Sequence, residues 1–152
     1  MMTAKGKAIL EENFTVVVPI QVRFRDLDAM GHVNNAVYLS YLEVARMVYY
    51  HQLVGWTKPE DFASVLANVN IDFISPIFLG DEIWVGARIE RVGNRSYTFA
   101  YEIREGKSGR LIARATSVQV MYDYTTQSTF PVPEDLVAQL EAFEGRALRE
   151  VE

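Results

Sequence analysis

The chain has no cysteine and only two histidines, His32 and His51. Without cysteine it can form neither disulfides nor thiolate metal sites, and a cysteine nucleophile is excluded. Two histidines are also too few for a multi-histidine metal site. We therefore expect no bound metal ion.

Long apolar runs are missing as well. Residues 1–14 contain lysines, but their apolar runs are only two or three residues long, which is typical of neither a signal peptide nor a membrane anchor. We expect a cytoplasmic protein with no membrane partner. The net charge of −5 argues against nucleic acid as a partner, because phosphate backbones are bound by an excess of Lys and Arg. With 152 residues and no linker or low-complexity segment, residues 1–152 are predicted to form a single domain.

The charge is unevenly distributed along the chain. Residues 86–114 contain seven basic and only three acidic side chains. Such a segment suits either solvated strand edges and turns or a rim that binds an anionic ligand, and the sequence leaves both interpretations open.

Residues 24–55 form the central feature of the sequence. Residues 25–33 read as an acidic turn that contains glycine, and residues 36–53 as one long helix that ends before Gly55. Asn34 and Asn35 precede it and can cap its free N–H groups. The polar positions Ser40, Glu43, Arg46 or Met47, and Tyr50 share one narrow stripe. A helix this apolar is predicted to be buried on most sides.

The rest of the chain alternates with a period of two. We expect a loosely ordered lead-in over residues 1–12, a strand over 14–23, a loop or short helical turn over 56–62, and a short amphipathic helix that begins near Pro133. Four consecutive strands are predicted over residues 65–73, 83–89, 97–103 and 111–124, with Gly93-Asn94 as a hairpin turn. This order predicts an α+β domain of the hotdog type, in which a curled antiparallel five-stranded sheet wraps a long central helix. Its unpaired edges predict a homodimer or homotetramer.

The motif around the helix start is more specific. Residues 24–35 read FRDLDAMGHVNN and are followed by Tyr38, the run Tyr41-Leu42-Glu43, and Arg46. This pattern resembles the signature of hotdog acyl-CoA thioesterases of the 4-hydroxybenzoyl-CoA thioesterase type, and the resemblance covers roughly residues 14–130. It implies hydrolysis of an acyl-CoA thioester to free acid and CoA, with CoA as part of the substrate and no cofactor.

The resemblance also implies roles for individual residues. In that family the second aspartate of the motif is the nucleophile or general base, which corresponds here to Asp28. A backbone N–H near Asn34 and Asn35, best matched by Asn35, would polarise the thioester carbonyl. A helix start independently favours this, because its free N–H groups and dipole stabilise a developing oxyanion. Gly31 would allow close backbone approach.

Other residues have more than one interpretation. Asp26 is the structural member of the aspartate pair. His32 is either an acid or base, as in some hotdog dehydratases, or a hydrogen-bonded support. Tyr38 either packs in the core or lines an acyl pocket, and Glu43 either supports the site or pairs with Arg46 or Arg25. The family's CoA phosphate contacts correspond to Arg91, Asn94 and Arg95.

Three alternative functions remain open from the sequence. They are an acyl-ACP thioesterase, a hotdog dehydratase, and a module that binds acyl-CoA without catalysis. Asp28 favours an enzyme, because a binding module has little need of a carboxylate beside a thioester.

Overall fold

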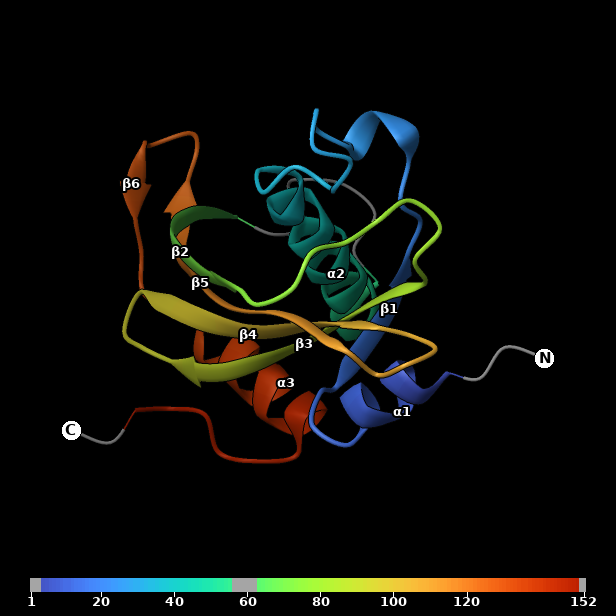
Figure 1. Ribbon diagram of the computed structural model, residues 1–152. Helices are drawn as coiled ribbons and strands as arrows, with labels where there is room; N and C mark the ends of the chain where they lie inside the picture. The colour runs from blue at the N-terminus through green and yellow to red at the C-terminus, as the bar shows by residue number, and fades with distance from the viewer. Residues whose placement is uncertain (1–3, 56–62, 151–152) are drawn as a thin grey trace.

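A curled antiparallel sheet wraps one long helix (Figure 1). The computed structural model describes residues 4–55 and 63–150. The strands follow the order β1 (Val16–Ile20), β3 (Ile83–Val92), β4 (Ser96–Glu105), β5 (Leu111–Asp123) and β2 (Ser64–Phe73). A short sixth strand, β6 (Ser128–Thr129), pairs only with the end of β5. Helix α2 (Val37–Val54) packs against β1 and β3, and α3 (Glu134–Glu144) against β3 and α2.

This architecture confirms the predicted α+β hotdog fold. The central helix, the four later strands and the terminal helix all form within a few residues of their predicted bounds. Helix α2 contains neither glycine nor proline, and Gly55 ends it in the left-handed region with its N–H bonded to the His51 carbonyl. The β3–β4 connection takes residues 93–95, one more than the predicted two-residue turn. The segment predicted as a loop over residues 56–62 lies outside the described residues.

The core lies between α2 and the sheet and is rich in tyrosine. Tyr49 and Tyr50 of α2 meet the Phe99 ring of β4 at centroid distances of 5.1 and 5.8 Å. Burial of these rings brings their hydroxyls together, and the Tyr50 and Tyr97 oxygens lie 2.7 Å apart. Satisfying each other's hydrogen bonds removes most of the cost of burying them.

Helix α2 is buried on its sheet-facing side only. Its buried residues include Tyr41, Leu42 and Ala45, whereas Leu39 and Val44 on the other side are 40% and 44% exposed. The prediction of burial on most sides is therefore wrong for a single chain, in which only one face of the helix is buried. The apolar exposed face is unusual for a helix that is fully packed by its own domain.

Two local predictions are wrong. Residues 5–11 form helix α1 (Lys5–Glu11) rather than part of a loose lead-in. This helix is held in place because Leu10 is fully buried and the Gly6 N–H donates to the Gly106 carbonyl at 2.8 Å. A Cβ atom on Gly6 would lie 2.4 Å from the Glu105 carbonyl oxygen, so only glycine permits this approach. Strand β6 is absent from the prediction, because a two-residue strand leaves no period-two pattern.

No helix within the described residues is long and apolar enough to cross a bilayer.

Candidate active site

Residues 27–33, which directly follow η1 (Phe24–Asp26), form a tight hairpin that is here called the site loop. An antiparallel bridge between Leu27 and Val33 closes it. Within the bridge the Asp28 N–H donates to the His32 carbonyl at 2.8 Å, and the Gly31 N–H donates to the Asp28 carbonyl at 3.1 Å. Gly31 has a φ of 85°, where a side chain would be strained, and a Cβ atom there would meet nothing. The need for glycine at position 31 is therefore explained by the positive φ of this turn.

Asp26 joins the site loop to the central helix. Its side chain is buried, and its Oδ2 accepts hydrogen bonds from the Arg23 N–H at 2.9 Å and the Tyr41 hydroxyl at 2.8 Å. Its backbone carbonyl accepts the Asn34 N–H at 2.9 Å. Burial alone would raise the pKa of Asp26, but these hydrogen bonds and the Arg23 charge outweigh it and lower that pKa. Asp26 is thus an ionised structural residue, as predicted.

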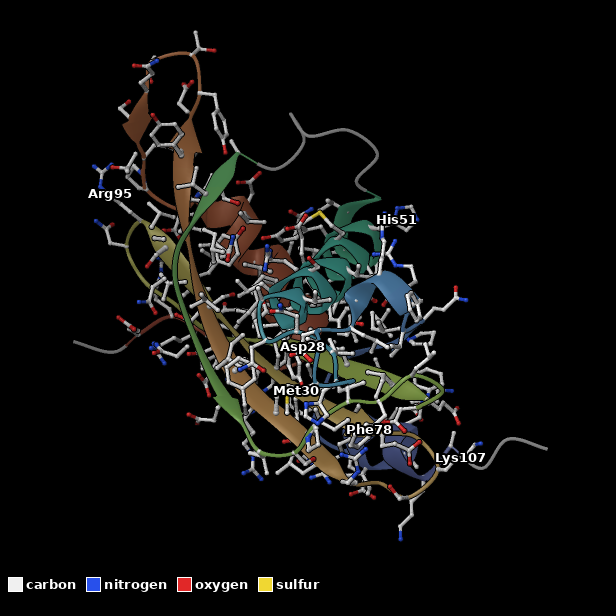
Figure 2. All side chains as sticks on the ribbon, turned by 45° about the horizontal axis from the view of Figure 1, so that its top comes forward. Asp28, Met30, His51, Phe78, Arg95 and Lys107 are labelled. Atoms are coloured by element: carbon white, nitrogen blue, oxygen red, sulfur yellow. The ribbon has the colours of Figure 1, made fainter. Side chains whose placement is uncertain are left out.

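Asp28 presents a carboxylate at the surface. One oxygen, Oδ1, accepts the Met30 N–H at 2.9 Å, which orients the carboxylate within its own turn. The other oxygen has no hydrogen-bond donor among the described residues, and the residue is exposed. Figure 2 shows Asp28 and Met30 close together, near the middle of that view. A role of Asp28 in its own turn and a catalytic role are therefore compatible, because the turn uses only one oxygen.

The two asparagines form a turn just before α2, which begins at Val37 rather than at the asparagines themselves. Asn34 accepts the Ala36 N–H on its side-chain oxygen at 2.9 Å, and its carbonyl accepts the Val37 N–H at 2.9 Å. Asn35 is exposed, and its own N–H donates to no atom of the described residues. The helix dipole points its positive end toward this group. An exposed, unpaired N–H at a helix start is a suitable oxyanion donor.

His32 packs rather than hydrogen-bonds. Its ring meets the Phe78 ring edge-on at a centroid distance of 5.3 Å, and its ring nitrogens have no partner among residues 4–55 and 63–150. No carboxylate in that part of the chain orients the imidazole, as a general base of the triad kind would require. This geometry is that of a support for the site loop.

Sequence reasoning missed the role of the segment that carries Phe78. Residues 75–81, here called the support loop, have the sequence pattern of a turn, and the Val33 N–H donates to the Ile77 carbonyl at 2.9 Å. Pro76 and Gly80-Asp81 signal the turn, but no local pattern shows that it packs under a segment more than 40 residues earlier.

Tyr38 and Glu43 differ in environment. Tyr38 is buried, and its ring packs edge-on against Phe73 at 5.0 Å. Glu43 is exposed on the next turn of α2 and forms no ion pair among the described residues. Arg46, one of its expected partners, donates to the Tyr101 hydroxyl at 3.1 Å. Burial would lower the pKa of Arg46, but Tyr101, Tyr50 and the charge of Glu43 together raise it.

The predicted CoA phosphate contacts, here called the basic end, lie in or beside the β3–β4 connection, and Figure 2 shows Arg95 far from Asp28. Arg91 contacts Glu90 at 3.4 Å and Glu150 at 3.1 Å, whereas Arg95 donates to the Thr129 carbonyl at 2.8 Å. Asn94 lines a pocket of about 380 Å³ together with Arg149, a residue that sequence reasoning missed. Within one chain, this basic end and Asp28 do not form a single site.

Comparison with known proteins places the chain in a family. A family model described as the thioesterase-like superfamily matches residues 22–140. The long-chain acyl-CoA thioesterase FadM of Escherichia coli strain K12 is 30% identical over 124 residues, which are 80% of this chain and 94% of that protein. A 1,4-dihydroxy-2-naphthoyl-CoA hydrolase of Nostoc punctiforme is 26% identical over 128 residues, covering 79% of this chain and 82% of that protein.

A solved structure agrees. The crystal structure of a thioesterase from Thermus thermophilus, complexed with coenzyme A and Zn, has a TM-score of 0.80 and 38% sequence identity, and the match covers 90% of this chain and 99% of that one. The chain therefore belongs to the thioesterase-like superfamily, and the predicted class of thioester hydrolase is confirmed. The narrower 4-hydroxybenzoyl-CoA thioesterase type stays a prediction.

The lowered pKa of Asp26 predicts a pH-dependent stability. Because the folded pKa lies below the unfolded value of about 3.9, the ionised carboxylate stabilises the fold above that pH, and the stabilisation is lost as pH falls through the folded pKa. Asp26→Asn should therefore lower the free energy of unfolding by about 2 kcal/mol at pH 7. The gap to wild type should close below about pH 4.

Urea unfolding at several pH values checks this, with Asp28→Asn as the control. Asp28 is exposed, so its substitution should change stability by no more than about 0.5 kcal/mol. A gap for Asp26→Asn that is the same at every pH would contradict the assignment.

Proposed function

We propose that this protein hydrolyses acyl-CoA thioesters, with Asp28 as nucleophile or general base and the Asn35 N–H as oxyanion donor. The observation that carries the proposal is their placement: an exposed carboxylate oxygen lies within the site loop, and an N–H that has no partner among the described residues follows that loop at the start of α2. Membership of the thioesterase-like superfamily supports this interpretation.

The chemistry follows from these two groups. The thioester carbonyl oxygen accepts the Asn35 N–H, which with the helix dipole stabilises the negative charge that develops on it. As a base, Asp28 takes a proton from water while the oxygen of that water bonds to the carbonyl carbon. The tetrahedral intermediate then expels the CoA thiolate by breaking the C–S bond, and Asp28 returns the proton to the sulfur. As a nucleophile, Asp28 would bond to the carbonyl carbon through a carboxylate oxygen, and the C–S bond would break to release the CoA thiolate. Water would then hydrolyse the resulting mixed anhydride to the free acid and regenerate the Asp28 carboxylate.

Coenzyme A is the favoured carrier of the acyl group. FadM is named as a long-chain acyl-CoA thioesterase, the Nostoc relative as a 1,4-dihydroxy-2-naphthoyl-CoA hydrolase, and the Thermus structure contains coenzyme A. These names differ in the acyl group and agree in the carrier, so the proposal specifies CoA and leaves the acyl group to measurement.

A second copy of the chain is part of the proposal. Among the described residues strand β2 pairs only with β5, and the apolar side chains Leu66, Phe73 and Ile74 on and beside it are 45%, 46% and 49% exposed. A strand edge with apolar side chains beside it is a site for pairing with another chain. Such a partner would cover the exposed face of α2, and it could bring the basic end of one chain to the site loop of the other.

Asp28→Asn tests the chemical roles. The substitution keeps the size of the side chain and the turn bond to Met30 but removes nucleophile and base, so kcat for acyl-CoA should fall by a factor on the order of 10²–10⁴. Binding should survive, because the helix start is untouched. Thiol release over a panel of acyl-CoAs measures this beside melting temperature, with His32→Ala as the comparison. Normal turnover in Asp28→Asn and collapse in His32→Ala would move the site to the histidine of a dehydratase.

The assembly can be disrupted at β2. The wild-type protein should be a dimer or larger in dilute solution, and Leu66→Lys should weaken the assembly and lower activity with it, because a charge would be buried at the edge. Glu12→Lys, at an exposed position after α1, is the control and should do neither. Light scattering at several concentrations measures the mass, and a fully active wild-type monomer would refute the paired arrangement.

Substitutions in the basic end are expected to raise KM for acyl-CoA. If Arg91 or Arg95 meets CoA phosphates, changing it to Gln should raise KM about fivefold with less effect on kcat, because a remote phosphate contact stabilises ground and transition states alike. Arg95 should matter more, because Arg91 already contacts Glu90 and Glu150. Steady-state kinetics at low and high salt check this, and an unchanged KM in both variants would assign these arginines to solvated strand edges.

A further inference from the structure

Arg110, directly before β5, holds the support loop. One guanidinium nitrogen, Nη1, donates to the Pro76 carbonyl at 2.7 Å and to the Ser75 hydroxyl at 2.9 Å, and Nη2 donates to Oδ2 of Asp81 at 3.1 Å. The Arg110 and Asp81 side chains are 34% and 22% exposed, so the pair is less screened than an ordinary surface ion pair. A single arginine thus contacts the support loop near both of its ends.

Asp81 connects Arg110 to the backbone of the support loop. The same Oδ2 that accepts from Arg110 also accepts the Phe78 N–H at 2.8 Å, and the Asp81 N–H donates to the Phe78 carbonyl at 3.1 Å. Charge-assisted hydrogen bonds of this kind are stronger and more directional than neutral ones. The turn from Phe78 to Asp81 is therefore set by the position of the guanidinium.

The support loop in turn holds the site loop. The Ile77 carbonyl accepts the Val33 N–H at 2.9 Å, and the Phe78 ring packs on His32, whose carbonyl accepts the Asp28 N–H at 2.8 Å. Val33 is the residue whose bridge to Leu27 closes the site loop. His32 and Val33, which pair with the Asp28 side of the site loop, thus pack against the support loop.

The first turn of α2 rests on the same elements. Burial raises the pKa of Tyr38, and the positive charge of Arg110 and a hydrogen bond with the Ile77 backbone partly offset that rise. Tyr38 follows Asn35 by three residues, so the helix start and the site loop share one support. Their relative position depends on that support.

We propose that Arg110 is a positioning residue for thioester hydrolysis, which fixes Asp28 relative to the Asn35 N–H through the support loop. The inference rests on the proposed function. Arg110 contacts neither reacting group, and its effect is exerted through backbone. Displacement of a reacting group by about 1 Å can cost on the order of 100-fold in rate, so loss of this support should appear in kcat.

Arg110→Met is the test variant, and Arg114→Met is its matched control. Arg114 lies four residues further along, within β5, and it pairs with Glu102 at 3.5 Å with its side chain 59% exposed. We expect kcat to fall at least about tenfold in Arg110→Met with KM within about twofold, and no change in Arg114→Met. Arg110→Lys should recover part of the loss, because it keeps the charge but not the forked geometry.

A double-mutant cycle separates positioning from general damage. If Arg110 acts through Asp28, then Arg110→Met should lower kcat no further once Asp28 is already Asn. Losses that multiply in the double variant, or an equal loss in Arg114→Met, would overturn the proposal.

Amide hydrogen exchange provides a readout independent of activity. In Arg110→Met the Asp28 and Val33 amides should exchange at least about tenfold faster, because their hydrogen bonds depend on the support loop, and Arg114→Met should leave them unchanged. Unchanged exchange in Arg110→Met would refute the positioning role even if the wild-type protein hydrolysed no thioester. Faster exchange with an inactive wild type would instead refute the proposed function alone.

Discussion

The bridge between Leu27 and Val33 is the contact on which the candidate site depends. It makes seven residues into a closed loop with Asp28 on the turn side and Asn34 and Asn35 on the helix side. A two-residue bridge has too few hydrogen bonds to persist alone in water. Its persistence therefore requires neighbours, and the structure supplies them from both sides.

On one side Asp26 contributes a buried carboxylate, and on the other the support loop contributes a carbonyl. Asp26 connects the site loop to Tyr41 of α2. Ile77 connects the site loop to the support loop, which Arg110 holds beside β5. Both are charged or backbone groups with satisfied partners, and breaking either would leave a polar group unpaired at a partly buried position. The fold thus places an exposed carboxylate on a rigid support.

The sequence predicted the elements well because their signals are local. The largely apolar sequence of α2, the period-two strands and the Gly55 cap each depend on neighbours within one element. The structural role of Asp26 followed from the motif, and its burial agrees. The roles of Asp28, Asn35 and His32 came from a family resemblance, and the structure supplies their surroundings without testing them.

What the sequence did not predict depends on contacts between distant segments. Helix α1 is stable because Leu10 is buried and Gly6 meets the β4–β5 turn, about 100 residues away, and the support loop matters because Ile77 meets Val33. A sequence pattern within a few residues does not reveal a contact between such distant segments. The exposed face of α2 has a similar origin, because no segment among residues 4–55 and 63–150 covers Leu39 and Val44.

The most direct test is a structure of the protein with a non-hydrolysable ketone analogue of an acyl-CoA. The account predicts that the carbonyl oxygen lies about 2.7–3.1 Å from the Asn35 nitrogen, with an Asp28 oxygen, or a water bonded to it, facing the carbonyl carbon. A carbonyl bound away from the start of α2, with Asp28 turned from it, would contradict the account.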